Sequence, residues 1–165
     1  MSYFVKDLVQ NEYQKKFAGM TEFVVISTTG VSGVDNNIMR GDLKKEGLRA
    51  VVVRNNLMRR VIEEMQLTAA SELFDAGQCT VIFGSSASSA AKQAVAWAKK
   101  IKIIQLKGAF VDGVVMAGDA GVKAVAAMPT RAEMHGQIAQ IALSPGGVIA
   151  GCIKTLIDNM EKEAA

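Results

Sequence analysis

The sequence contains few of the residues that build disulfide frameworks and metal sites. Two cysteines and one histidine occur among its 165 residues. Cys79 and Cys152 are too few for a disulfide framework or a zinc site, and each lies in an apolar run, which favours a small core residue. His135 has no second histidine and no suitably spaced thiol or carboxylate pair. The sequence therefore predicts no metal site and no cofactor.

Motifs for catalysis and nucleotide binding are absent as well. The sequence contains no G-x-x-x-x-G-K-S/T, no G-x-G-x-x-G and no G-x-S-x-G. The segment Gly84-Ser85-Ser86 lacks the lysine and the second glycine of a phosphate loop, and it is typical of a helix cap. We therefore expect a protein that is not an enzyme. One alternative stays open, a small α/β enzyme or anion-binding module that uses the Ser85–Ser89 run at a helix N-terminus.

The sequence also contains no long apolar run and no segment with the pattern of a signal peptide. No apolar run approaches the roughly 20 residues that cross a bilayer. Lys6, Asp7, Asn11 and Glu12 interrupt the start, where a signal peptide needs an apolar stretch. With 50% hydrophobic and 21% charged residues, the composition is typical of globular proteins. We expect a cytoplasmic protein that does not contact a membrane.

Helical and strand patterns alternate over residues 1–128. Helices are predicted at residues 2–18, 32–47, 57–65, 67–76 and 87–100, and strands at 22–27, 48–53, 79–83, 103–110 and 114–116. The alternation predicts an α/β fold whose sheet is covered by helices on both faces. Val111-Asp112-Gly113 is a hairpin signal, so we expect a mixed sheet and not a purely parallel one.

A domain boundary is predicted at Met128-Pro129-Thr130. Pro129 ends the preceding helix, and Thr130 with Glu133 forms a T-x-x-E capping box for the next one. The boundary separates an α/β domain of residues 1–128 from an extended C-terminal helical tail of residues 129–165.

The tail has an apolar stripe that no later strand could cover. Beyond an expected break at Ser144-Pro145-Gly146-Gly147, apolar side chains recur at helical spacing. They are Val148, Ile149, Cys152, Ile153, Leu156, Ile157 and Met160. A helix with so broad an apolar stripe is predicted to bind partner helices. Two alternatives stay open: the helix could pack back on its own sheet, or terminal helices could seal a homo-oligomer.

The stretch from Leu48 to Glu64 changes from a strand pattern to a basic helix. Its first residues predict a strand covered on both faces, and the helix that follows turns its apolar side to the core. Seven of the 19 lysines and arginines fall within 21 positions around this junction. The guanidinium groups of arginine, side-chain amides and the N–H groups at a helix N-terminus can donate hydrogen bonds to the phosphate and sugar oxygens of a nucleic acid. The predicted RNA-binding residues are Arg40, Lys44, Arg54, Asn55, Asn56, Arg59 and Arg60. The alternative is a solvated basic helix face.

Four stretches, in their order and spacing, resemble the family of bacterial ribosomal stalk-base proteins, large ribosomal subunit protein ten. They are VVVRNNLMRRVIEE, GQCTVIFGSSASSAAKQAVAWAKK, IIQLKGAFVDG and AVAAMPTRAEMHGQIAQIALSP. The family's basic N-x-L-x-R-R segment after a valine strand matches the stretch that contains Arg54, Asn56, Leu57, Arg59 and Arg60. Its lysine and glycine before the hairpin match Lys107 and Gly108, and its P-S/T-R-x-E tail opening matches Pro129 to Glu133. The resemblance covers almost the whole chain.

The resemblance implies a structural protein of the large ribosomal subunit, located in the cytoplasm. Its globular domain would bind large-subunit rRNA at the base of the stalk, near ribosomal protein eleven. Its tail helix would carry dimers of the acidic stalk protein that recruits translational GTPases. The same RNA face could repress the protein's own messenger RNA, as members of the family do.

Overall fold

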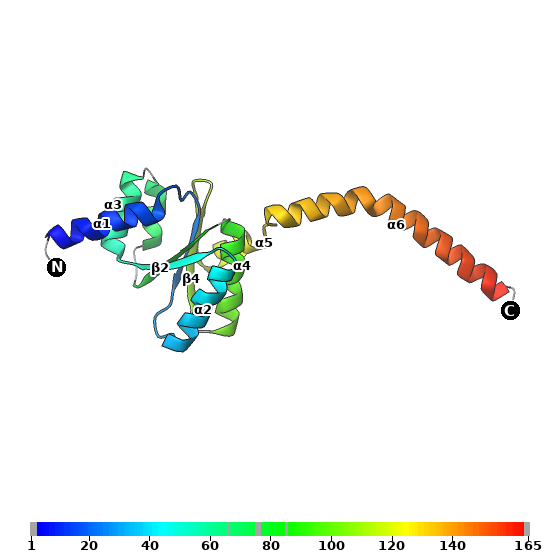
Figure 1. The fold of residues 1–165 in the computed structure, drawn as a ribbon, viewed down its shortest axis with the longest axis horizontal. Coiled ribbons are helices and arrows are strands. Elements are labelled where there is room, and N and C mark those ends of the chain that lie inside the picture. Colours follow the sequence, from blue (N-terminus) through cyan, green and yellow to red (C-terminus); the bar gives the residue numbers. More distant parts are fainter. Residues whose placement is uncertain (1–2, 66, 75–76, 85, 164–165) are drawn as a thin grey trace. The chain divides into compact units, whose positions relative to one another are not determined.

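The computed structural model describes residues 3–65, 67–74, 77–84 and 86–163 (Figure 1). It divides at the Met128–Pro129 bond into two compact units, Met1–Met128 and Pro129–Ala165. We call them the globular unit and the tail unit.

Helices and strands alternate along the described part of the globular unit. The helices are α1 (Tyr3–Phe17), α2 (Gly33–Lys45), α3 (Asn55–Glu64), α4 (Ala87–Lys100) and α5 (Gly118–Ala127), with a 3-10 helix, η1 (Thr68–Phe74). The strands are β1 (Phe23–Ser27), β2 (Arg49–Val53), β3 (Cys79–Phe83), β4 (Gln105–Val111) and β5 (Val114–Ala117). The predicted α/β class is confirmed. The short helix predicted at 67–76 is a 3-10 helix where it is described, and residues 75 and 76 lie outside the described residues.

The five strands form one sheet in the order β2-β3-β1-β4-β5, and each pair of neighbours is antiparallel. The expected mixed sheet is therefore corrected to an antiparallel one. β1 and β2 run parallel to each other and are joined through α2, but β3 lies between them. β3 and β4 are likewise parallel and joined through α4, with β1 between them. The alternating sequence pattern identified these two βαβ connections. It did not show that a strand of each unit lies between the two strands of the other, because that arrangement depends on long-range strand pairing.

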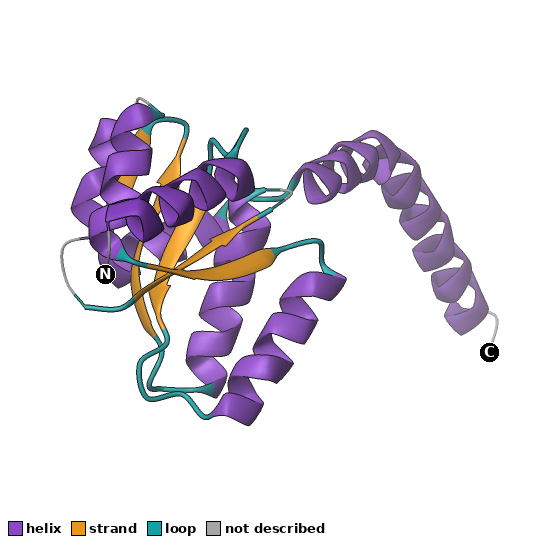
Figure 2. Cartoon of the chain, turned by 60° about the vertical axis from the view of Figure 1, so that its left-hand side comes forward, coloured by secondary structure: helices purple, strands orange, loops and turns teal. Residues whose placement is uncertain are grey.

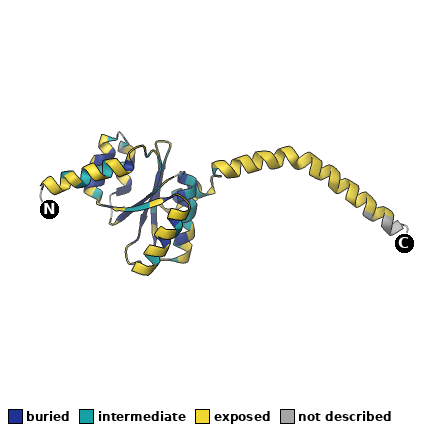
Figure 3. Cartoon of the chain, in the orientation of Figure 1, coloured by how far each residue is buried: buried dark blue, intermediate teal, exposed yellow. Residues whose placement is uncertain are grey.

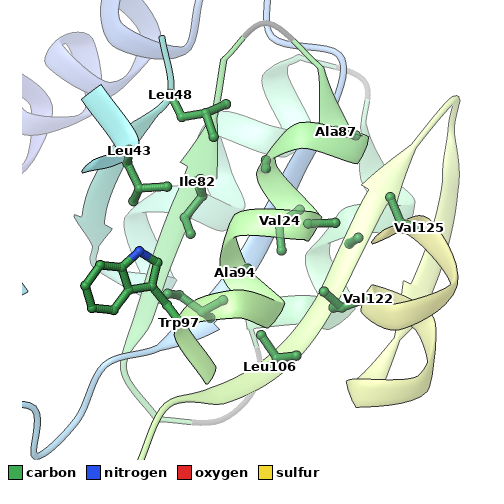
Figure 4. Close-up of a cluster of buried hydrophobic side chains, with 14 of the residues drawn as sticks. Val24, Leu43, Leu48, Ile82, Ala87, Ala94, Trp97, Leu106, Val122 and Val125 are labelled. Atoms are coloured by element: carbon green, nitrogen blue, oxygen red, sulfur yellow. The ribbon is translucent and has the colours of Figure 1, made fainter. Parts of the chain in front are cut away.

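Side chains along the strands alternate between two cores on opposite faces of the sheet. Val24 and Ile26 of β1 pack in a first core with α2, α4 and α5. Phe23 and Val25 pack in a second core with α1, α3 and η1. Figure 4 shows the first core, in which Ala94 and its small neighbours let α4 lie close to the sheet. The prediction of helices on both faces is confirmed.

β2 forms an edge of the sheet, although its apolar run predicted a strand covered on both faces. Only Val53 among its five residues is buried, and Val52 is 39% exposed. A short apolar run can occur in a central strand or in an edge strand. The run does not show how many neighbouring strands there are. Arg49 at the start of β2 is exposed, and so is Arg54, which follows the buried last residue of the strand.

The predicted hairpin joins β4 and β5 through Asp112 and Gly113. Both residues have positive φ angles, 50° and 81°, and Val111 lies opposite Val114. Two central residues with positive φ form a type I′ turn, for which Asp-Gly is a favoured pair.

The described part of the tail unit is one helix, α6 (Arg131–Glu163), after the predicted capping box. The N–H of Glu133 donates to Oγ1 of Thr130 at 3.4 Å, and the N–H of Thr130 donates to Oε2 of Glu133 at 2.9 Å. The break predicted at residues 144–147 is wrong, because the helix continues through Pro145. Pro145 has no N–H to donate and its ring crowds an earlier carbonyl, so the helix bends and does not end. Figures 1 and 2 show the bend.

Over Arg131–Ile157, α6 is also long and apolar enough to cross a membrane, by length and composition alone. This finding corrects the expectation that no segment reaches that length. The apolar run is interrupted by glutamine, serine and proline, which add no charge, so its mean hydropathy stays high. All side chains of α6 whose burial is described are exposed, as the yellow helix in Figure 3 shows.

Candidate nucleic-acid interface and partner helix

The candidate nucleic-acid interface is centred on the junction where β2 ends and α3 begins. Arg54 has extended backbone angles, φ −86° and ψ 116°, and its carbonyl accepts the N–H groups of Leu57 and Met58 at 3.1 and 2.9 Å. It is the N-cap residue but forms no side-chain cap. α3 buries Leu57, Met58, Val61 and Ile62. Its polar residues are therefore left on the outer flank, around an N-terminus that carries a partial positive charge.

Contacts between α1 and α3 complete this junction. Glu64 accepts a hydrogen bond from Nε2 of Gln10 at 2.6 Å and another from Gln14. The backbone N–H of Arg54 donates to the Tyr13 hydroxyl at 3.3 Å. These contacts hold α1 along α3 and bring Lys6 beside the first turn of α3.

A hollow of about 490 Å³ opens at this point, and we call it the α3 hollow. It is lined by Lys6, Arg54, Asn55, Asn56, Leu57 and Arg60. Arg54, Asn56 and Arg60 are exposed, and Asn55 is half-buried. Three cations and two amides thus gather at one helix start, which is chemistry suited to phosphate and sugar oxygens.

Two predicted RNA-binding residues also hold the fold together. The side-chain amide of Asn55 donates to the carbonyl of Gly77 at 2.7 Å. The half-buried Arg59 donates from Nη2 to the carbonyl of Phe74 at 3.0 Å, and it does not line the α3 hollow. Arg59 therefore anchors η1 to α3, whereas the neighbouring Arg60 lines the hollow.

A second hollow contains the two predicted residues of α2, Arg40 and Lys44. It has a volume of about 450 Å³, and its other cations are Lys16 of α1 and Arg49 of β2. We call it the β2 hollow. Arg49 begins β2 and Arg54 follows its end, so roughly 16 Å of strand separates these two arginines at about 3.3 Å per residue. The structure therefore divides six of the seven predicted RNA-binding residues between two hollows along one sheet edge, and Arg59 lines neither.

Lys6, Lys16 and Arg49 line these hollows but were not among the predicted RNA-binding residues. Arg49 belongs to the basic run around the junction, so proximity in sequence was an available signal for it. Lys6 and Lys16 lie on α1, and the amphipathic pattern of that helix does not indicate where it docks. The docking of α1 on the rest of the globular unit brings them to the two hollows.

The start of α4 is the site that the alternative anion-binding hypothesis requires, and the N–H groups of Ala87 and Ser89 there have side-chain partners within the chain. Oγ of Ser86 accepts the N–H of Ser89 at 3.3 Å. Oε2 of Glu22 accepts the N–H of Ala87 at 3.0 Å. Ser85 lies outside the described residues. Because a carboxylate already occupies this helix start, it disfavours a second anion.

The tail helix presents the apolar residues predicted to bind a partner. The larger ones are between 49% and 69% exposed, namely Val148, Ile149, Ile153, Leu156, Ile157 and Met160. Cys152 is an exposed free thiol, so its interpretation as a core residue is corrected, whereas Cys79 is buried as expected. The exposed apolar surface also includes four residues before the bend that were not among the predicted partner-binding residues. They are Met134, Ile138, Ile141 and Leu143.

Comparison with known sequences connects this geometry with a family. A sequence model of the family described as ribosomal protein L10 matches residues 4–99, which is more than half of the chain. The chain belongs to the ribosomal protein L10 family.

Bacterial members of this L10 family, each named large ribosomal subunit protein uL10, align over most of the chain. The protein of Leptospira biflexa is 29% identical over 147 residues, which cover 86% of this chain and 82% of the relative. That of Coprothermobacter proteolyticus is 31% identical over 123 residues, covering 74% and 69%. That of Caulobacter vibrioides is 30% identical over 129 residues, covering 78% and 74%.

Membership of the L10 family makes this chain a structural protein of the large ribosomal subunit. It is therefore part of a ribonucleoprotein particle that carries out translation in the cytoplasm. The matched segment, residues 4–99, spans α1 to α4 and includes both hollows. α6 lies beyond the segment that the family model matches.

Proposed function

We propose that the globular unit binds large-subunit rRNA at the base of the ribosomal stalk, near ribosomal protein eleven. We further propose that α6 anchors dimers of the acidic stalk protein that recruits translational GTPases. In this role the protein is a scaffold and catalyses no reaction. The observation that carries the proposal is the α3 hollow, where Lys6, Arg54 and Arg60 surround the start of a helix.

The chemistry of both hollows supports binding of an RNA backbone. Guanidinium groups of Arg54 and Arg60 can donate two hydrogen bonds to one phosphate, and the Asn56 amide can bond a sugar hydroxyl. The β2 hollow adds Arg40 and Lys44 at the other end of the edge strand. Two separate basic groups can contact two stretches of backbone, which favours a folded RNA over a free mononucleotide.

We propose that the same surface also lets the protein repress its own messenger RNA. A protein that contacts mainly phosphates and sugars can bind a similar fold in its own messenger RNA. We expect the rRNA fragment to displace the messenger, because both would occupy the two hollows. Competition binding with labelled messenger RNA tests this step.

The exposed stripe on α6 supports a protein partner for the tail. A Leu or Ile side chain gains about 1.5–3 kcal/mol when it moves from water to a fully buried site. Ile153, Leu156 and Ile157 lie on neighbouring turns and are exposed together. Covering them with the apolar faces of partner helices would therefore stabilise a complex substantially.

The RNA proposal is tested by measuring how the affinity of the full chain for a stalk-base rRNA fragment depends on salt. Replacing Arg54 and Arg60 by glutamine removes two phosphate contacts, so the slope of log affinity against log salt should fall by about 1.5. The matched control is Lys99→Gln with Lys102→Gln, because these exposed lysines belong to the α4 side, on the opposite face of the sheet. Equal effects of the two double variants would contradict the assignment.

The tail proposal is tested with the full chain and purified stalk protein. Ile153→Gln with Leu156→Gln keeps good helix formers but removes two apolar side chains, so the affinity should fall about 100-fold or more. Lys154→Gln on the same helix is the control and should bind normally. Binding of rRNA should be unchanged in both variants, because the two proposed surfaces belong to different units. Stalk-protein binding that survives the double substitution would refute the proposal.

A further inference from the structure

A lysine and a cysteine from two strands that are not neighbours meet in the globular unit. Nζ of Lys107 on β4 lies 3.1 Å from Sγ of Cys79, the first residue of β3. β1 lies between these two strands in the sheet. The lysine side chain therefore reaches across a whole strand to the thiol.

A β-bulge in β4 makes this contact possible. Val25 of β1 lies opposite Gly108, but the next residue, Ile26, lies opposite Leu106. Lys107 is therefore the extra residue of the bulge and has no partner of its own in the register.

The extra residue decides which face of the sheet Lys107 occupies. Ala109 packs in the first core and Phe110 in the second. Simple alternation backwards from Ala109 would turn Lys107 toward the first core. The bulge turns it toward the second core, where Cys79 is buried.

Among the hydrogen-bonding contacts of Sγ in the described part of the chain, the Lys107 amine is the nucleophile. Cys79 is fully buried, and its Sγ lies 3.7 Å from the carbonyl of Gly77 and 3.9 Å from that of Leu73. Carbonyl oxygens do not trap an oxidised sulfur, whereas a primary amine does. Lys107 is half-buried, so part of this residue reaches solvent.

We propose that Cys79 and Lys107 form a redox modification site, at which hydrogen peroxide produces a covalent sulfur–nitrogen bridge. Peroxide first transfers an oxygen to the thiol: an S–O bond forms, the O–O bond breaks, and water leaves. The Lys107 amine, having released its ammonium proton to water, then attacks Sγ. The S–N bond forms as the S–O bond breaks, and the departing hydroxide takes the second amine proton as water. One thiol, one amine and one peroxide thus yield one sulfenamide and two waters.

The bridge has two consequences for the globular unit. It joins the start of β3 to the bulge of β4 across β1, so it restricts the unfolded chain as a disulfide does. It also removes the positive charge of Lys107. A dithiol reductant reverses it, because thiol attack on sulfur restores the cysteine and the amine and forms a disulfide in the reductant.

Peptide mass spectrometry of the full chain tests the proposal. Cys152→Ser serves as background, since it removes the exposed thiol of the tail. After peroxide treatment, we expect a linked peptide pair whose mass is about 2 Da below the sum of its parts, and dithiothreitol should release it. The bridged protein should also melt several degrees higher than the untreated protein.

Lys107→Arg is the matched control, because it keeps the charge but replaces the amine by a guanidinium of low nucleophilicity. We expect no linked pair in this variant and further oxidation of Cys79 to the sulfinic acid. Cys79→Ala is a second control. It keeps Lys107 but removes the sulfur, so no linked peptide pair should form. Cys79 that stays reduced in the parent chain, or that becomes sulfinic acid without a link to Lys107, would overturn the proposal.

Discussion

The side-chain amide of Asn55 donates a hydrogen bond of 2.7 Å to the backbone carbonyl of Gly77. This bond connects the first turn of α3 with the residues that lead into β3, although 22 positions separate the two residues in the chain. It fixes one wall of the α3 hollow, because Asn55 belongs to the lining. The same side chain thus serves the fold and the proposed RNA surface.

Loss of this bond should be measurable as a loss of stability. Asn55→Ala leaves the Gly77 carbonyl without its side-chain donor, which should cost about 1 kcal/mol. Thermal denaturation should show a melting temperature lower by roughly 2–4 °C for a chain of this size. Asn56→Ala changes the adjacent, exposed amide and should leave the melting temperature nearly unchanged. A similar decrease in both variants would mean that the Asn55–Gly77 bond contributes nothing specific.

Gly108 should not tolerate a side chain. A Cβ there would lie 2.5 Å from Cδ2 of Leu73 and 2.8 Å from the carbonyl oxygen of Met116, and the second atom belongs to the backbone. Gly108→Ala should therefore lower the free energy of unfolding by about 1–3 kcal/mol in urea denaturation. Gly41→Ala is the control, because nothing lies within 4 Å of its Cβ position in α2, and it should stabilise by up to about 1 kcal/mol.

The two hollows should contribute independently to RNA affinity. Arg40→Gln with Lys44→Gln removes two cations from the β2 hollow, so the salt slope should again fall by about 1.5. Combined with Arg54→Gln and Arg60→Gln, the decreases should add, because the two groups share no lining residue. An unchanged slope for the β2 double variant would restrict the interface to the α3 hollow.

Pro145 should set the bend of α6. A straight helix spans about 26 Å over the 17 residues between positions 137 and 154, at about 1.5 Å per residue. Spin labels at these two positions in a Cys152→Ser background should give a longer separation in Pro145→Ala than in the parent, since alanine restores the missing hydrogen bond. Ser144→Ala should leave the separation unchanged. Equal distances in all three proteins would assign the bend to another cause.

Local sequence patterns predicted most elements of the globular unit. The Asp112-Gly113 turn, the Thr130–Glu133 capping box and the α3 face of buried residues all follow from chemistry within a few positions. The interpretation of β2 as a covered strand was wrong, because apolar runs do not report the number of neighbouring strands. The predicted break at Pro145 was wrong for a similar reason, since a proline within a helix can bend it without ending it.

The basic residues of the candidate site were predicted only in part. Arg54, Asn56 and Arg60 lie together because they fall within the first two turns of one helix, which is a local property. Arg59 lies in the same part of α3 but donates to Phe74, a contact that depends on where η1 packs. Lys6 enters the hollow from α1, so its role depends on a helix docking that no local pattern specifies.

The sequence by itself determined the α/β class, the family and the presence of an apolar tail helix, because periodicity, capping and turn chemistry act within a few residues. Only the tertiary structure decided that the sheet is antiparallel, that the cations form two separate hollows, and that Lys107 meets Cys79. Each of these outcomes depends on strand pairing or helix docking between residues far apart in the chain. Such contacts are selected by how well distant apolar surfaces fit together, which no short stretch of sequence records.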